Sequence, residues 1–278
     1  MIDRYLKPFD EKTIIANTPP VGYRFTGWVG DIGFLDNPMS EIAIVTMPDN
    51  NVHIIAEYSP IPIAIVKFGL LYNWYAATDI RKITSSDSWL VPSYNMGVTL
   101  ANFGGGYNVG GGKLKEVGTV HWEMGYPSSY NVGATNEFNF NARGAGYRSE
   151  TGSYVSIGER GNFWATTEYY EGVGYVIQLM SGSGDIVTSG AFPRNRGNSI
   201  RLCNPTTTLS HGETGVYIGN DGQMYPTICI GTQEWISCNL TEAKYRNGDL
   251  ISEITDATQW TGLTTGAMCA YDNDWNNV

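Results

Sequence analysis

The side chains that most often carry out chemistry in proteins are widely separated in this sequence. The three histidines are His53, His121 and His211, and the four cysteines are Cys203, Cys229, Cys238 and Cys269. No Ser, His and Asp set can be assembled around these histidines as a nucleophilic triad. The cysteines form no CxxC pair, so they predict no zinc site and are read as buried free thiols or as one or two disulfides. We therefore expect no catalytic residue and no metal ligand among them.

A glycine-rich segment, residues 104–118, has the composition of a phosphate-binding loop. A phosphate loop of the Walker type requires glycine five residues before the Gly112–Lys113 pair and Ser or Thr directly after it. Those positions hold Tyr107 and Leu114, so the motif is excluded. We expect glycine-rich loops whose backbone passes close to aromatic side chains.

The segment Tyr271–Asn276 gathers oxygen-bearing side chains near the C-terminus. Asp272 and Asp274 are two residues apart, a spacing that a calcium ion could use. A solvated turn is the simpler interpretation of so short a segment. We therefore predict no cofactor, with calcium at this turn as the alternative.

Binding is the chemistry that the sequence favours most. Between Trp164, expected in the core, and Arg201, the loops are rich in Tyr, Arg, Asn, Ser and Gly, the composition of antibody-like binding surfaces. Tyr and Trp faces also suit sugar rings. The candidate ligand-binding residues are Glu168, Tyr169, Tyr170, Tyr175, Phe192, Arg194, Asn195, Arg196 and Asn198.

The composition of the chain limits the classes of partner that such a surface can bind. The chain has 278 residues, 42% of them hydrophobic, and a net charge of -10. That acidity argues against nucleic acid, which requires clustered Lys and Arg. No apolar run is long enough for a membrane span, and the N-terminus lacks the apolar centre of a signal peptide. We expect a fragment of a secreted protein, a chain lacking its leader, or export by another route such as virion assembly.

The elements that must position these residues are mostly strands. Residues 41–47 and 52–58 alternate in polarity and are joined by Pro-Asp-Asn-Asn, which predicts a hairpin; residues 22–31 supply a third strand. Further on, we expect one short helix over residues 87–103, capped by Ser86 or Asp87. Four strands are then predicted as a meander, over residues 163–167, 175–180, 185–189 and 199–203. The fold class is α+β, mostly β.

The N-terminal text resembles the internalin B-repeat. GYRFTGWVGD at residues 22–31 and TMPDNNVHIIAEY at residues 46–58 correspond to the two recurring halves of that repeat. The resemblance implies a small β-grasp-like spacer, residues 1–60, of the kind found in bacterial surface proteins, with a trimmed or divergent first strand.

Residues 61–204 resemble the Fibrobacter succinogenes major paralogous (FISUMP) domain of Bacteroidetes surface proteins. Seven motifs occur in order: GLLYNWYAAT, WLVPS, GGKLKE, HW, GATNEFNFNARGAGYR, GNFWATTEY and GNSIRLC. The resemblance implies a C-type-lectin-like fold, shared with the variable proteins of diversity-generating retroelements. In those proteins the segment ending in G-x-S-[VI]-R forms the ligand surface, which carries that role to residues 168–170 and 194–198.

The tail, residues 205–278, resembles the opening half of the same FISUMP domain. It either completes the preceding domain by circular permutation, which we favour, or begins a truncated second copy. A lone half would leave Trp235, Ile236 and Trp260 exposed. The resemblance also implies a disulfide between Cys203 and Cys269.

Together these patterns predict a non-enzymatic adhesin or receptor-binding protein, displayed on a Bacteroidetes surface or a phage virion. Its partner would be a cell-surface glycan or protein, and its location extracellular. The alternative is a structural subunit of a fibre, pilus or phage tail that assembles with other subunits and has no separate ligand. An enzyme is the third hypothesis, because the related formylglycine-generating enzymes need a cysteine pair and a GNVWEW-like run that this sequence lacks.

Overall fold

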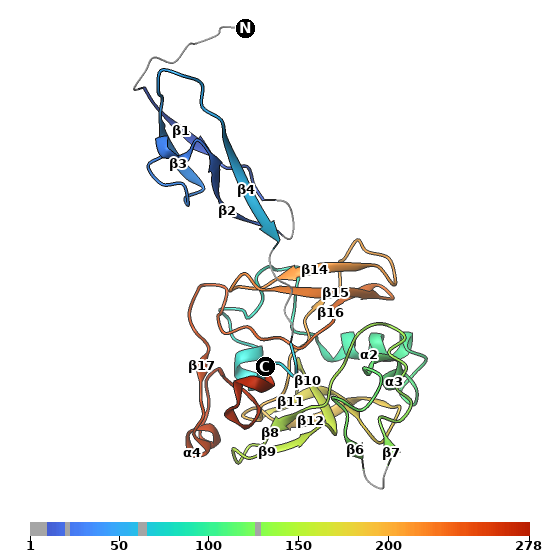
Figure 1. The fold of residues 1–278 in the computed structure, drawn as a ribbon. Coiled ribbons are helices and arrows are strands. Elements are labelled where there is room, and N and C mark those ends of the chain that lie inside the picture. The colour runs from blue at the N-terminus through green and yellow to red at the C-terminus, as the bar shows by residue number, and fades with distance from the viewer. Residues whose placement is uncertain (1–9, 20–22, 61–65, 126–128) are drawn as a thin grey trace. The chain divides into compact units, whose positions relative to one another are not determined.

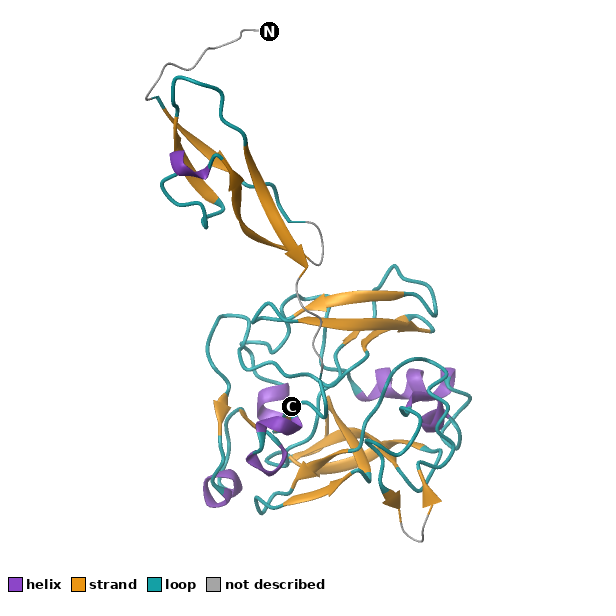
Figure 2. Cartoon of the chain, in the orientation of Figure 1, coloured by secondary structure: helices purple, strands orange, loops and turns teal. Residues whose placement is uncertain are grey.

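The computed structural model describes residues 10–19, 23–60, 66–125 and 129–278. The chain divides into two compact units, Met1–Pro62 and Ile63–Val278, coloured from blue to red along the chain in Figure 1. Strands predominate over short helices in both units (Figure 2). Within the described residues, no helix has the length and apolarity needed to cross a bilayer.

Unit 1 contains two antiparallel strand pairs. Strand β1 (Glu11–Ile15) pairs with β3 (Ile42–Thr46), and β2 (Tyr23–Gly30) pairs with β4 (Ile54–Pro60); the 3-10 turn η1 (Ile32–Phe34) follows β2. The predicted hairpin is therefore wrong in its pairing, although its two strands exist. The backbone N of His53 donates to Asp31 Oδ2 at 2.8 Å, which fixes the start of β4 beside the end of β2 and not beside β3.

Aromatic packing centres unit 1 on the buried Trp28. The Phe25 ring lies 5.7 Å from Trp28 and 6.1 Å from Tyr58, and the indole N–H of Trp28 donates to the backbone oxygen of Ser40 at 2.8 Å. Both the apolar ring and its polar group are thereby satisfied.

The largest sheet of unit 2 has the strand order β12-β11-β10-β8-β9. Its strands are β8 (Ala145–Arg148), β9 (Tyr154–Ile157), β10 (Arg160–Tyr170), β11 (Val173–Met180) and β12 (Ile186–Pro193). The predicted meander is confirmed for β10, β11 and β12, which pair antiparallel in succession. The fourth predicted strand is wrong: Ser199 makes only an isolated bridge to Phe163, and β13 (Cys203–Asn204) joins another sheet.

The longest helix, α2 (Tyr94–Phe103), contacts this sheet. Ser93 caps it, because its hydroxyl accepts the Met96 backbone N–H at 3.4 Å. The predicted cap at Ser86 or Asp87 is thus wrong. The helix begins only after Pro92, because proline in a helix interior has no N–H to donate and its ring clashes with the preceding turn. The helix buries Gly97, whose ideal Cβ would lie 2.8 Å from Ile177.

Two shorter helices and a minor strand pair accompany α2. These are α1 (Trp74–Ala77), α3 (Gly110–Leu114), and the pair β6 (Met124–Gly125) with β7 (Ser129–Tyr130). The glycines of α3 permit close approach of backbone to backbone, since an ideal Cβ on Gly111 would lie 2.0 Å from the Asp185 oxygen. The expectation that they face aromatic side chains is wrong.

The C-terminal residues share unit 2 with the residues that precede them. One sheet has the order β13-β16-β15-β14, with β14 (Thr214–Ile218), β15 (Met224–Ile230) and β16 (Gln233–Ile236). Another joins β17 (Ser252–Glu253) and β18 (Ala267–Cys269) to the early strand β5 (Leu71–Tyr72). Helix α4 (Ala257–Thr261) and the 3-10 turns η2 (Tyr271–Asn273) and η3 (Trp275–Asn277) complete the chain. In this arrangement Trp235, Ile236 and Trp260 are fully buried.

All four cysteines are free thiols. Cys203 lies opposite Trp235, in the core cluster under α2, whereas Cys269 lies opposite Leu71, in a separate cluster with Trp260. The Cys203–Cys269 disulfide is therefore a wrong prediction, because the two residues belong to different sheets and different cores. Burial raises the pKa of both thiols.

Candidate functional site

Four tyrosines, Tyr94, Tyr169, Tyr170 and Tyr175, form a tyrosine cluster at the end of the β10–β11 hairpin. Ring centroids lie 5.2 Å apart for Tyr169 and Tyr170, 5.1 Å for Tyr169 and Tyr175, and 4.6 Å for Tyr175 and Tyr94. Tyr169 and Tyr170 are 53% and 61% exposed, and the other two are half-buried. The inner pair therefore supports an outer pair that is open to solvent.

An irregularity in β10 explains how two successive tyrosines touch. Neighbouring residues of a regular strand point to opposite faces. The pairing of β10 with β11 shifts register between Trp164 and Glu168, and again between Glu168 and Tyr170. Such bulges redirect side chains, and here they bring Tyr169 and Tyr170 together.

Arg194 is held against the body of unit 2. Its guanidinium lies 4.5 Å from the Trp74 ring and pairs with the Glu168 carboxylate, which also accepts the Gly172 backbone N–H at 3.2 Å. The Arg194 backbone N donates to the Gly172 oxygen at 3.1 Å. Arg194 and Glu168 thus fasten the hairpin turn over Trp74.

Arg196 and Asn195 are likewise engaged within the chain. The Arg196 guanidinium lies 4.0 Å from the Phe192 ring and pairs with Glu150 at 2.9 Å. The Asn195 amide donates to the backbone oxygens of Glu150 at 3.2 Å and Thr261 at 3.1 Å. These residues and Phe192 are only partly exposed, so they form a rigid base and not a set of adaptable polar contacts.

Asn198 is wrong as a candidate contact residue. It is fully buried, and its backbone exchanges hydrogen bonds with Tyr72 at 2.8 and 2.9 Å. A ligand at the surface cannot reach it. Asn198 of the GNSIRLC motif therefore has a structural role and does not belong to the ligand surface that the motif was expected to form.

Beside Trp74 the surface is hollowed into a cavity of about 340 Å³, which we call the Trp74 pocket. The indole N–H of Trp74 donates to the Ala165 oxygen at 3.0 Å, and an ideal Cβ on Gly174 would lie 2.4 Å from the ring. Glycine at position 174 therefore lets the indole sit against β11. The lining residues are Trp74, Ala77, Thr78, Asp79, Lys82, Ile83, Thr84, Leu90, Val91, Ser93, Met96 and Thr166.

The Trp74 pocket adjoins the tyrosine cluster through neighbouring residues. Ser93 lines the pocket and Tyr94 follows it; Thr166 lines the pocket and its neighbour Thr167 accepts the Tyr94 backbone N–H at 3.0 Å through its hydroxyl. Residues of the tyrosine cluster and of the hydroxyl-lined cavity thus follow one another at the start of α2 and are linked to β10 by this hydrogen bond.

The polar groups of the pocket suit hydrogen bonding with a hydroxylated ligand. Four hydroxyls line it, together with the Asp79 carboxylate and the Lys82 ammonium. The bond from Arg81, at 2.8 Å in the ion pair, is the main cause that lowers the pKa of Asp79, so this carboxylate is an acceptor at neutral pH. Hydroxyls beside an aromatic face give both orientation and contact area.

Two side-chain oxygens of the proposed calcium turn are engaged within the chain. Asn273 Oδ1 accepts the Tyr154 hydroxyl at 2.6 Å, and Asp274 Oδ1 accepts the Asn276 backbone N–H at 2.9 Å. Across the part of the chain that the structure describes, no three His, Cys, Asp or Glu side chains gather as a metal site.

Comparison with protein families matches residues 7–62 to the divergent InlB B-repeat domain. The predicted B-repeat module is confirmed, and the match coincides with unit 1, which ends at Pro62. Comparison with curated proteins found no match, and comparison with solved structures found none. Because the match covers unit 1 alone, the site on unit 2 rests on its own geometry.

Sequence reasoning missed Tyr94 and the pocket role of Trp74. From the sequence, Tyr94 falls within the expected helix over residues 87–103, and Trp74 has no role beyond its place in a family motif. The Ser-Tyr step after Pro92 is a helix start, which places Tyr94 at the exposed first turn. Its contact with Tyr175 is a tertiary feature with no local signal.

Proposed function

We propose that this protein is a non-enzymatic binding protein, displayed outside the cell or on a virion, whose unit 2 recognises a cell-surface glycan or protein. The tyrosine cluster supplies contact area, and the Trp74 pocket supplies hydroxyl and carboxylate hydrogen bonds. A glycan fits both parts, because sugar rings stack on aromatic faces and carry hydroxyls for the pocket.

The observation that carries the proposal is the exposure of Tyr169 and Tyr170. These two adjacent rings stay more than half exposed although Tyr169 packs edge-on against Tyr175, so they bury little apolar area on folding. Tyrosine at such positions is the residue type that dominates binding hot spots. Exposed aromatic rings lower the solubility of a protein, and a ligand that covers Tyr169 and Tyr170 would account for their exposure.

We also propose that unit 2 is a lectin-like domain of the FISUMP type. The support is the ordered set of seven motifs and the mostly β architecture. The B-repeat of unit 1, a module of bacterial surface proteins, supports an extracellular location and a spacer role.

A screen of the intact chain on a glycan array and on intact bacterial cells tests the proposal. We expect saturable binding that the double substitution Tyr169→Ser and Tyr170→Ser weakens at least tenfold, while Tyr107→Ser, at an exposed tyrosine outside the cluster, leaves it unchanged. A parallel arm with a calcium chelator tests the Asp272–Asp274 turn. Equal binding by the native chain, the double variant and the Tyr107→Ser variant contradicts the assignment of the site.

A structural subunit of a fibre, pilus or tail is the second candidate, favoured by a patch on unit 1. Ile42 faces Ile15 across the β1–β3 pair, Ile44 lies on the same face, and all three side chains are exposed. Such a face is typical of modules that pack against neighbours. Ordered oligomers in sedimentation experiments, combined with no binding in the screen, would favour this function.

A further inference from the structure

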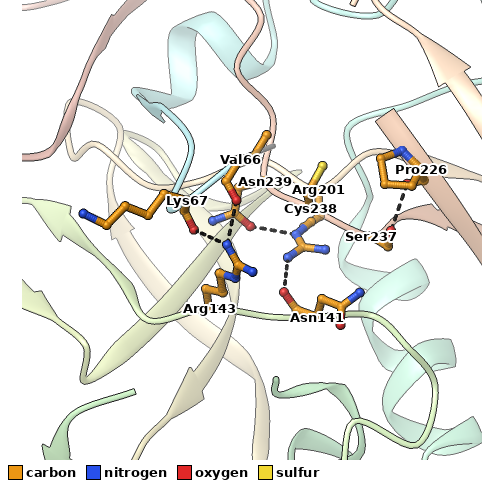
Figure 3. A pocket seen from close by; sticks show the side chains of 9 residues that line it. All are labelled: Val66, Lys67, Asn141, Arg143, Arg201, Pro226, Ser237, Cys238 and Asn239. Carbon is orange, nitrogen blue, oxygen red and sulfur yellow. Dashed lines mark hydrogen bonds between the residues drawn. The ribbon is translucent and has the colours of Figure 1, made fainter. Parts of the chain in front are cut away.

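A second cavity of unit 2, of about 330 Å³ (Figure 3), shares no lining residue with the Trp74 pocket. Its lining includes three cationic side chains, Lys67, Arg143 and Arg201, and no carboxylate, on a chain whose net charge is -10. The remaining lining residues are Val66, Asn141, Pro226, Ser237, Cys238 and Asn239. We call this cavity the arginine pocket.

Arg201 is a buried cation without an anionic partner. Its guanidinium donates to Asn239 Oδ1 at 2.7 Å and to the backbone oxygens of Phe140, Ile236 and Asn141 at 2.6, 3.1 and 2.8 Å. Among the described residues, all of its hydrogen-bond acceptors are therefore neutral. Burial is the main cause that lowers the pKa of Arg201 to about 9, which expresses the cost of an uncompensated charge.

Arg143 faces Arg201 in the same cavity, with Asn239 between them in Figure 3. Arg143 pairs with Glu116 at 2.7 Å and donates to the backbone oxygens of Val66 at 2.7 Å and Lys67 at 2.9 Å. Glu116 balances the charge of Arg143. The charges of Arg201 and Lys67 stay unbalanced by any ion pair within the described residues.

Each arginine of the pocket keeps one N–H that has no acceptor among the described residues. A guanidinium has five N–H groups; Arg201 and Arg143 each make four hydrogen bonds, and Nη2 makes only one of them in both. The Lys67 ammonium points away from the two guanidinium groups (Figure 3) and bonds Asn276 and Asn277, which do not line the cavity. Two guanidinium N–H groups at one cavity thus lack an acceptor among the described residues.

We propose that the arginine pocket binds a small oxyanion group: a sulfate, phosphate or carboxylate, either free or carried by a sugar. Such a group would supply the negative charge that Arg201 lacks and accept the remaining N–H groups of Arg201 and Arg143. The cavity volume admits one such group with part of a sugar ring. This site is separate from the tyrosine cluster, so the proposal stands or falls independently of the proposed function.

Cys238 offers a readout at the site itself. It lines the arginine pocket and is partly exposed, whereas Cys203, Cys229 and Cys269 are buried and serve as internal references. The experiment measures the rate of Cys238 alkylation by neutral iodoacetamide in the intact chain, by peptide mass spectrometry. Inorganic phosphate, sulfate, glucuronate and glucose 6-phosphate are titrated against sodium chloride at matched ionic strength, and glucose is the neutral control.

We expect at least one of the four oxyanions to slow alkylation saturably, while glucose and chloride do not. Protection by glucuronate or glucose 6-phosphate assigns a sugar-borne group, and protection by the inorganic ions alone assigns a free one. Lys67→Gln, which removes an ammonium that points away from the cavity and keeps both arginines (Figure 3), should leave protection unchanged.

Lys113→Gln is the matched control, because Lys113 also lies 5.5 Å from a phenylalanine ring, as Lys67 does, but outside the pocket. It should leave protection unchanged. Equal rates in oxyanion and chloride, or loss of protection in the Lys67→Gln variant, would overturn the proposal.

Discussion

Glu242 predicts a specific dependence of stability on pH. Its side chain is fully buried; Oε2 accepts the Asn220 backbone N–H at 2.6 Å, and Oε1 has no hydrogen-bond partner among the described residues. Burial first, and then the charge of Asp221, raise the pKa of Glu242 from its ordinary value of 4.5 to about 8. The substitution Glu242→Gln keeps the acceptor and the shape but removes the titration.

The sign follows from the raised pKa. Between pH 4.5 and about 8 the folded chain holds a proton on Glu242 that the unfolded chain has released, so stability falls as the pH rises through this window. The loss is about 1.4 kcal/mol per pH unit in the middle of the window, and about 5 kcal/mol in all as an upper limit. The variant should lack this loss.

Urea unfolding of the two proteins at pH of about 5.5, 6.5 and 7.5 tests this prediction. Seven of the eight tryptophans lie in unit 2, so fluorescence follows its unfolding. The difference in unfolding free energy between variant and native chain should grow in favour of the variant by about 2–3 kcal/mol over these two pH units; other groups cancel in the difference. A constant difference would show that Glu242 is ionised in the folded state.

Three further substitutions test the packing of unit 2. Lys115→Met removes three partly buried hydrogen bonds of 2.8, 2.9 and 2.8 Å to backbone oxygens and should cost about 3 kcal/mol or more of unfolding free energy in urea. Gly111→Ala, which in an ordinary helix stabilises by up to about 1 kcal/mol, should instead destabilise by about 1–3 kcal/mol, because its Cβ would lie 2.0 Å from the Asp185 oxygen; a raised melting temperature contradicts this. Gly174→Ala should displace the Trp74 indole, visible as a changed near-ultraviolet circular dichroism spectrum, and an unchanged spectrum would refute the contact.

Local pattern predicted the strands of this protein better than their partners. Alternation and turn residues identified β10, β11 and β12, which are neighbours in sequence and pair in that order. The pairing of β1 with β3, and the parallel contact of β10 with β8, depend on tertiary packing. Alternation within a strand carries no information on such partners.

The exposed part of the candidate site could be predicted from the sequence, but its long-range contacts could not, because local pattern carries no information on distant partners. Tyr169 and Tyr170 are exposed, as their polar, aromatic setting indicated. Composition alone could not show that Arg194 stacks on Trp74, a residue far earlier in the chain, or that Asn198 is buried. Arg194 and Asn198, which were predicted to contact a ligand, instead make long-range contacts within the chain and support the surface.

The most direct test of the central claim is the dose–response of the intact chain on the glycan array and on bacterial cells, compared with the Tyr169→Ser and Tyr170→Ser double variant. If the tyrosine cluster is the ligand surface, the variant should bind at least tenfold more weakly, the loss of about 1.4 kcal/mol or more that hot-spot aromatics supply. Tyr107→Ser should bind as the native chain does. Native-like binding by the double variant, with its fold intact by circular dichroism, would contradict the account.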